Sequence, residues 1–195
     1  MTSESRGGRG GAPRERKSMV STQRLYQGRV LNLDIDRVRF PNGSLGELEL
    51  IRHSGAAAVV PFLDEPNDRG ARVLLLRQYR YAADDFLYEI PAGRLNDGEA
   101  PDECARRELL EEAGCTATAL VSLGGFFTTP GFIDEYIHTF IATGLTRGES
   151  MPESDEFIHQ ESHTLYEILR MIDEGRIVDA KTIVSLFMAD RLIRQ

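Results

Sequence analysis

The chain has 195 residues, of which 41% are hydrophobic and 28% are charged, and this composition is typical of one globular domain with its own core. The formal net charge of −8 argues against general nucleic-acid binding, and the sequence lacks both an apolar run long enough to span a membrane and a secretory signal. We therefore expect a cytoplasmic protein in which Cys104 and Cys115 are reduced thiols.

The first nineteen residues differ from the rest of the chain. Residues 1–19 carry five basic and two acidic side chains, are rich in glycine and show no apolar pattern, which predicts a disordered leader. The stretch RGGRGG is similar to RNA-binding segments of the RGG type, but two short repeats favour a flexible leader over RNA binding. The sequence leaves open whether Met19 is the true start.

Strand patterns dominate the next part of the chain. Residues 20–53 contain two alternating runs around a Pro-Asn-Gly turn signal, which predicts an antiparallel β-hairpin as a separate N-terminal segment. Residues 54–195 are predicted to form the main domain, with an α+β fold. Its expected strands and C-terminal helices, in chain order, are strands 56–63, 72–80, 86–90, 119–127 and 134–142, and helices 164–175 and 179–192.

A further helix is predicted just before Gly114, and its charges are placed unfavourably. Pro101 suits its first turn and Gly114 its C-terminal cap. Glu108, Glu111 and Glu112 fall within one arc of its surface at the negative end of the helix dipole, where anions are destabilising. A solvated acidic face is the usual interpretation of such a run, but it does not explain this placement. A divalent cation such as Mg²⁺ reverses the penalty, so we interpret the three glutamates as a metal site.

A longer pattern includes this helix. From Gly93 through Glu99 and RELLEEAG to Cys115, the chain resembles the Nudix box, and Cys115 is the one departure, where the family prefers an aliphatic residue. The resemblance implies an α/β/α sandwich around a mixed sheet and metal-dependent hydrolysis of a phosphoanhydride. In such chemistry the metals polarise the pyrophosphate and activate a water molecule.

The resemblance also assigns roles to residues of the box. It implies that Glu108 and Glu112 are direct ligands of Mg²⁺, for which Mn²⁺ can substitute, and that Glu111 serves a second ion or a bridging water. The backbone carbonyl of Ala92 would complete the metal cage. Arg107 would orient a glutamate, and Glu99 would brace the loop.

Features outside the box resemble one subfamily, the ADP-ribose pyrophosphatases. They are Pro130, fifteen residues beyond Cys115 in the stretch TTPGFIDE, together with RQYR (77–80), EIPAG (89–93) and GRIVDAKT (175–182). The resemblance implies cleavage of ADP-ribose to AMP and ribose 5-phosphate by a homodimer whose contacts include the N-terminal hairpin. The alternatives are an ordinary hairpin that covers one sheet, a pyrophosphatase for GDP-mannose or another nucleotide sugar, and a catalytically silent Nudix domain that acts as a ligand sensor or interaction module.

Further site residues follow from the same resemblance. Glu135 is the expected catalytic base, with Asp134 as its nearest competitor, and it joins Glu111 and Arg107 in the predicted catalytic set. The predicted substrate-binding residues are Arg52, Arg77 and Arg80 for phosphates, Tyr26 and Phe132 for a base, and also Glu89 and Pro130. Tyr79 is a further stacking candidate, although aromatic residues at strand ends are as often part of the core.

Overall fold

The computed structural model describes residues 16–148 and 158–194. Residues 1–15, which hold most of the predicted leader and its RGGRGG stretch, lie outside this range. Strand β1 (Met19–Gln27) begins at the last residue of the predicted leader. No helix within the described ranges is long and apolar enough to cross a membrane.

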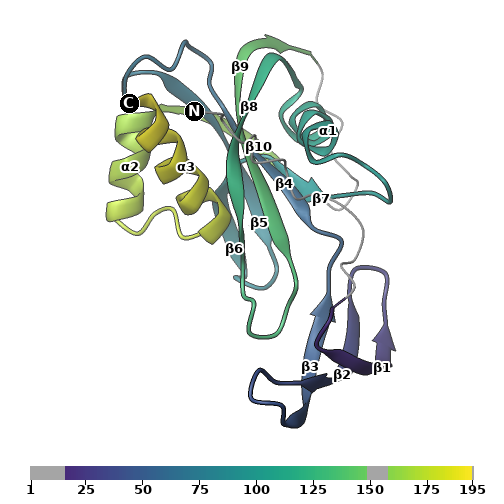
Figure 1. The fold of residues 1–195 in the computed structure, drawn as a ribbon. Helices are drawn as coiled ribbons and strands as arrows, with labels where there is room; N and C mark the ends of the chain where they lie inside the picture. The colour runs from purple at the N-terminus through teal and green to yellow at the C-terminus, as the bar shows by residue number, and fades with distance from the viewer. Residues whose placement is uncertain (1–15, 149–157, 195) are drawn as a thin grey trace, which may run out of the picture.

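The N-terminal segment forms a three-stranded antiparallel sheet. β2 (Asn32–Arg39) pairs with β3 (Leu45–Arg52) as the expected hairpin, and β1 pairs with the other edge of β2. β1 was not predicted, because all nine of its residues are exposed and no burial pattern imposes a period of two. This sheet projects away from the rest of the molecule (Figure 1).

The main body contains two further sheets. Their strands, in spatial order, are β7 (Ala92–Arg94), β4 (Ala56–Pro61), β9 (Tyr136–Arg147) and β8 (Cys115–Phe127) in the first sheet, and β10 (Ile158–Thr164), β5 (Arg72–Arg80) and β6 (Asp85–Glu89) in the second. The first sheet is mixed, because β4 runs parallel to β9 and antiparallel to β7. The backbone N–H of Leu63 donates to the carbonyl of Arg72 at 2.8 Å and joins the two sheets where β4 leads into β5.

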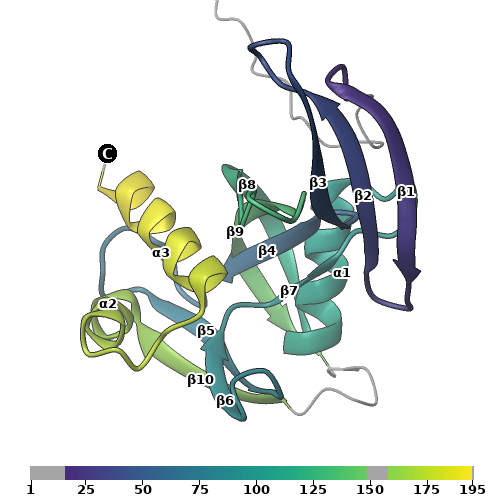
Figure 2. The ribbon, with the colours of Figure 1, turned by 90° about the horizontal axis from the view of Figure 1, so that it is seen from below.

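Helices cover both faces of these sheets. α1 (Pro101–Ala113) lies on one face, and α2 (Leu165–Asp173) and α3 (Ala180–Ile193) lie on the other (Figure 2). The uninterrupted apolar runs of β4 and β5 explain this arrangement, since a strand buried on both faces shows no alternation. Val59 packs in the cluster under α1, whereas its neighbour Val60 packs in the cluster under α2 and α3. The predicted α/β/α sandwich is confirmed.

The element boundaries differ from the predictions at a few places. β8 and β9 are longer than expected, and β7 and β10 were not predicted at all. β10 has the sequence IHQESHT, and none of its residues is fully buried. Its pairing with β5 therefore left no apolar signal in the sequence. β7 has only three residues, too few for a period to be recognised.

Backbone hydrogen bonds join one loop of the main body to the N-terminal sheet. The loop of residues 128–135 runs beside β3, where the N–H of Ile51 donates to the carbonyl of Phe132 at 2.8 Å and the N–H of Asp134 donates to the carbonyl of Ile51 at 3.3 Å. Ile51 and Ile133 form a parallel bridge. The N-terminal sheet therefore fixes the backbone that carries Asp134 and Glu135.

Candidate active site

Helix α1 presents its three glutamates toward the main body. Pro101 occupies its first turn, and Gly114 ends it in the left-handed conformation (φ 60°), with its N–H donating to the carbonyl of Leu110 at 2.9 Å. The fully buried Leu109 anchors the apolar face of the helix. Glu108 and Glu112, one turn apart, are only 7% and 3% exposed. Two carboxylates are thus buried side by side.

Arg107 compensates the charge at this end of the helix, whose last turn has no basic residue. Its Nη1 donates to Glu108 and, at 3.0 Å, to Glu111, while its Nε and Nη2 donate to Glu99 at 2.8 and 3.0 Å. These hydrogen bonds, the one to Glu99 foremost, raise the pKa of Arg107, and the same bond lowers the pKa of the Glu99 carboxyl. Arg107 thus restrains the side chains of three glutamates at once.

The loop before α1 is shaped around the glutamates. The backbone N–H of Ala92 donates to Oε2 of Glu112 at 2.9 Å. A Cβ on Gly93 would lie 1.9 Å from Oε1 and 2.1 Å from Cδ of Glu108, well inside van der Waals contact. A residue larger than glycine at this position would displace the Glu108 carboxylate. The Ala92-Gly93 pair therefore fixes where both carboxylates point.

A cleft of about 490 Å³ opens above these carboxylates. Seven of the residues predicted from the sequence line it, namely Arg80, Ala92, Arg107, Glu108, Glu111, Glu112 and Glu135. The cleft also contains residues that the sequence analysis did not select, namely Arg94, Thr128, Asp179, Ala180 and Lys181. Asp179, Ala180 and Lys181 belong to the stretch GRIVDAKT, whose resemblance to the subfamily assigns no role to their side chains.

The two candidate bases occupy different places. Glu135 lines the cleft, where its Oε2 accepts a hydrogen bond from the Thr128 hydroxyl at 2.8 Å and its Oε1 lies 3.5 Å from Nε2 of His53. Burial lowers the pKa of His53. Asp134 instead accepts a hydrogen bond from the backbone N–H of His53 at 2.7 Å, and its carboxylate lies 3.6 Å from the guanidinium of Arg52. The geometry favours Glu135 over Asp134 as the carboxylate that reaches a substrate.

A buried ion-pair cluster forms the opposite wall of the cleft. Nε and Nη2 of Arg80 donate to the two oxygens of Glu89, each at 2.7 Å, and Nζ of Lys181 also contacts Glu89. Glu89 is 1% exposed. Burial raises the pKa of its carboxyl, but the hydrogen bond from Arg80 and the charge of Lys181 outweigh burial and lower it. Glu89 contacts both cations but does not line the cleft. A direct substrate contact was predicted for it, and its position does not supply one.

Several predicted substrate contacts lie away from this cleft. Arg52 is bound to Asp34 and Asp36 within the N-terminal sheet, and Tyr26 on β1 is 57% exposed. The guanidinium of Arg77 lies over the rings of Phe86 and Tyr88, so β5 turns it away from Arg80. Pro130 and the exposed Phe132 sit in the loop beside β3 and do not line the cleft. Of the three arginines predicted to bind phosphate, only Arg80 lines the cleft in the described part of the chain.

The residues of the cleft suit an oxygen-seeking divalent cation. Five acidic residues line one cleft, namely Glu108, Glu111, Glu112, Glu135 and Asp179, and carboxylates are the ligands that Mg²⁺ prefers. As placed in the described ranges, no three acidic, histidine or cysteine side chains already converge on one point. Arg107 and the Ala92 amide engage Glu108 and Glu112 instead, so a cation would compete with these partners.

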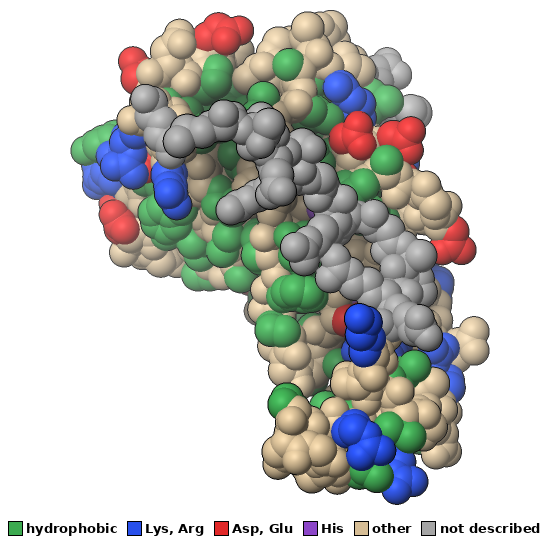
Figure 3. All heavy atoms as spheres, in the orientation of Figure 1, with side chains coloured by type: hydrophobic (Ala, Val, Ile, Leu, Met, Phe, Trp, Pro, Cys, Tyr) green, Lys and Arg blue, Asp and Glu red, His purple; other side chains and the backbone are tan. Residues whose placement is uncertain are grey.

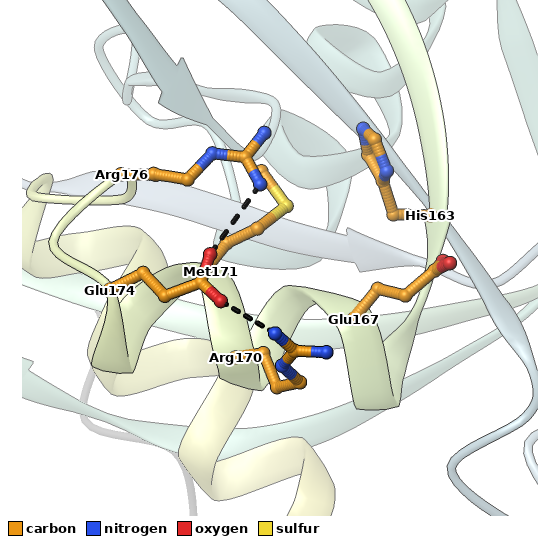
Figure 4. A pocket seen from close by; sticks show the side chains of 6 residues that line it. All are labelled: His163, Glu167, Arg170, Met171, Glu174 and Arg176. Carbon is orange, nitrogen blue, oxygen red and sulfur yellow. Dashed lines mark hydrogen bonds and ion pairs between the residues drawn. The ribbon is translucent and has the colours of Figure 1, made fainter.

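A second, smaller cavity lies at α2 and shares no residue with the cleft. It has a volume of about 180 Å³ and is lined by His163, Glu167, Arg170, Met171, Glu174 and Arg176 (Figure 4). Glu174 pairs with Arg170 at 2.8 Å and with Arg176 at 3.7 Å. One carboxylate of this cavity therefore contacts both of its guanidinium groups.

Known proteins resemble the chain along most of its length. Residues 53–185 match the NUDIX domain. The chain is 38% identical to the methanol dehydrogenase activator of Bacillus methanolicus and 35% identical to the ADP-ribose pyrophosphatase of Bacillus subtilis (strain 168), each match covering 86% of this chain and 89% of the relative. It is 32% identical to a GDP-mannose pyrophosphatase of Yersinia enterocolitica over 73% of this chain and 78% of the relative.

The fold has a counterpart among solved structures. The crystal structure of an ADP compounds hydrolase superposes with a TM-score of 0.78 and 20% identity, covering 91% of this chain and 94% of that one. The glutamates of the cleft lie within the residues that match the NUDIX domain, and that match covers more than half of the chain. The chain therefore belongs to the Nudix family and is a Nudix hydrolase.

Proposed function

We propose that the protein hydrolyses the pyrophosphate of ADP-ribose to AMP and ribose 5-phosphate with the help of Mg²⁺. The observation that carries this proposal is the cleft itself, where Glu108, Glu111, Glu112 and Glu135 face Arg80. A diphosphate needs both metal ligands and cations around it, and this cleft supplies both in a protein of net charge −8. Relatives named ADP-ribose pyrophosphatase, at 34–35% identity, support the choice of ADP-ribose.

In this proposal Glu108 and Glu112 hold the metal directly, Glu111 serves a second ion, and the carbonyl of Ala92 completes the set. When bound, a divalent cation neutralises the pyrophosphate and the departing phosphate. Glu135 takes the proton from the attacking water, whose oxygen bonds to one phosphorus while the bond from that phosphorus to the bridging oxygen breaks. Arg80 donates to phosphate oxygens and so keeps the diphosphate in line with the water.

The experiment that tests the proposal is a substrate panel with identification of the products. Purified protein is given ADP-ribose, GDP-mannose, ADP-glucose and NADH with Mg²⁺, and kcat/KM is compared. We expect ADP-ribose to be preferred and AMP to accumulate. GDP-mannose is the second candidate because of the relative at 32% identity. A tenfold preference for GDP-mannose, about 1.4 kcal/mol in transition-state binding, would overturn the choice of substrate.

A non-catalytic role makes a different prediction. One relative is named an activator of methanol dehydrogenase, and a Nudix domain that acts only through a partner would show no turnover of its own. The same panel separates the two cases because it contains no partner protein. Mg²⁺-dependent release of AMP by the isolated chain supports the enzyme, and no hydrolysis of any member of the panel supports the interaction role.

We also propose that the protein is cytoplasmic, with Cys104 and Cys115 as reduced thiols.

We propose further that the protein is a homodimer joined through the N-terminal sheet. Val20, Leu25 and Tyr26 of β1 are each at least half exposed, although strands usually bury one face. Apolar and basic side chains lie next to one another on this sheet (Figure 3). Burying the sheet against a second copy would cover these residues.

A further inference from the structure

The composition of the chain singles out one residue of the cleft. Of the 23 basic residues only two are lysines, Lys17 and Lys181. Lys17 precedes β1 and is exposed, whereas the side chain of Lys181 is only 15% exposed and lines the cleft. Lys181 lies in the first turn of α3, beside Asp179, which caps the helix by accepting from the N–H of Thr182 at 3.0 Å. A lysine at this point therefore faces the same space as the glutamates of α1.

The hydrogen bonds of Lys181 and Arg80 leave donors for a ligand. An ammonium group has three N–H donors, and within the described chain Lys181 directs two of them to Glu89 and, at 3.1 Å, to Asp179. A guanidinium has five donors, and Arg80 directs two of them to Glu89. Both side chains line the cleft, so the remaining donors can point into it.

Glu89 fixes both cations at once. Its carboxylate is 1% exposed and contacts Arg80 through both oxygens and Lys181 through Oε2. A buried carboxylate with two cationic partners restrains each of them, because moving either one leaves the buried charge less compensated. The N–H of Ile90, the next residue, donates to the hydroxyl of Thr182 at 3.0 Å, which ties this part of the chain to the start of α3.

We propose that Lys181 and Arg80 together bind one phosphate of the substrate on the wall opposite the glutamates, and that Glu89 is the positioning residue that holds this pair. The inference deepens the proposed function and rests on it, since it assumes a diphosphate in this cleft. It adds a phosphate ligand from α3 to the contacts expected from the sequence, and it reassigns Glu89 from substrate contact to counter-ion of the pair.

The first test uses the scarcity of lysine. Pyridoxal 5′-phosphate carries both an aldehyde and a phosphate, and its aldehyde condenses with a lysine amine to form an imine and water. Borohydride then reduces the imine to a stable secondary amine, and mass spectrometry reads the labelled peptides. We expect labelling of Lys181 in the wild-type protein. Inorganic pyrophosphate at ten times its dissociation constant should slow labelling of Lys181 about tenfold and leave Lys17 unaffected.

The second test compares variants at the two lysines. Losing one charge-assisted hydrogen bond weakens binding by roughly tenfold to a hundredfold, so Lys181→Met should raise the KM for ADP-ribose by that factor and change kcat much less. Lys181→Arg should recover part of the loss because it restores the charge, and Lys17→Met should behave as the wild type. Glu89→Gln should also raise KM if it retains the wild-type circular dichroism spectrum, because it releases both cations.

The outcomes separate this inference from the proposed function. A wild-type protein that hydrolyses nothing but shows pyrophosphate protection of Lys181 refutes the activity and supports the phosphate site. Active wild-type protein with equal labelling of Lys181 in the presence and absence of pyrophosphate refutes the phosphate site, as does a failure to label Lys181 at all. A Lys181→Met variant with unchanged KM and a lowered melting temperature would make Lys181 only a structural counter-ion of Glu89.

Discussion

Glu112 is a nearly buried anion in the last turn of α1, where the helix dipole disfavours it. Its Oε2 accepts the N–H of Ala92, and Arg107 on the same helix contacts Glu108 and Glu111. These contacts stabilise the glutamates of the free protein with protein groups alone. The same carboxylates remain on the wall of a cleft, so the arrangement suits a group that enters from solvent and carries positive charge.

Replacing Glu112 with glutamine tests the metal assignment. Glu112→Gln keeps the shape of the side chain but removes a charged ligand, so we expect kcat to fall by about a hundredfold or more, which is about 3 kcal/mol in the barrier. The Mg²⁺ concentration for half-maximal activity should rise, and EDTA should abolish wild-type activity until Mg²⁺ or Mn²⁺ is restored. Glu47→Gln, at an exposed position on β3, serves as the control. Full activity of Glu112→Gln would show that this carboxylate does not hold the metal.

The pH dependence of stability should report on His138. Burial lowers the pKa of His138 in the folded protein, while the unfolded chain keeps a value near 6.5. As the pH falls through 6.5, the unfolded chain therefore takes up a proton before the folded protein does, and the free energy of unfolding decreases. Urea unfolding between pH 7.5 and 5 should show this loss, and His138→Gln should show a shallower slope over the same range. Identical slopes would contradict the assignment.

The sequence predicted one wall of the site and missed most of the other. The glutamates of α1 lie within a single helix, so their spacing alone places them on one face. Lys181 and Glu89 are 92 residues apart, and their contact depends on how α3 packs beside β6 and β5, which no local pattern encodes. Arg77 and Arg80 were both predicted from the stretch RQYR, but they are three positions apart on one strand. Side chains alternate between the two faces of a strand, so the two arginines point to opposite faces, and only Arg80 lines the cleft.

At the scale of elements, α1 positions its glutamates through its packing. Leu109 is fully buried and belongs to the cluster that also contains Val59 and Leu74. The helix has no side-chain cap at Ala100, so packing of this face contributes much of its stability. Its orientation, and with it the direction of two carboxylates, depends on that packed face.

Shortening Leu109 should therefore affect stability and activity together. Leu109→Ala removes a buried side chain and leaves a cavity, which typically lowers the free energy of unfolding by about 2–5 kcal/mol. Urea denaturation monitored by circular dichroism measures this loss. Leu192→Ala, at a residue of α3 that is 42% exposed, should cost much less and is the matched control. Equal losses in the two variants would mean that α1 is not held by its apolar face.

Strand elements were predictable only where burial imposes a pattern. β5 was predicted with its exact bounds because Val73 to Leu76 form an uninterrupted apolar run that two layers cover. β1 and β10 are paired by backbone hydrogen bonds, but few of their side chains are covered, so their sequences resemble those of loops. Every residue except proline can make these backbone hydrogen bonds, so pairing alone imposes no period on the side chains.

At the scale of the whole molecule, the N-terminal sheet should control the oligomeric state. Leu25 on β1 is 50% exposed, and a charge there opposes burial against a second copy. We expect the wild-type protein to sediment as a dimer and Leu25→Asp to sediment as a monomer. Tyr166→Asp, at a residue of α2 that is 56% exposed, is the control and should remain dimeric. A wild-type monomer with full activity would refute the dimer proposal.

The backbone contacts between Ile51 and the loop of residues 128–135 restrict how this loop can change in evolution. Asp134 contacts β3 and the N–H of His53, whereas the adjacent Glu135 faces the cleft. If the contacts of Phe132 with β3 are kept, inserting one residue between Phe132 and Asp134 would move the aspartate, with its shorter side chain, into the place of Glu135 on the cleft side. An insertion before Phe132, near Pro130, would leave these contacts in place, so we expect differences in loop length between related enzymes to fall there.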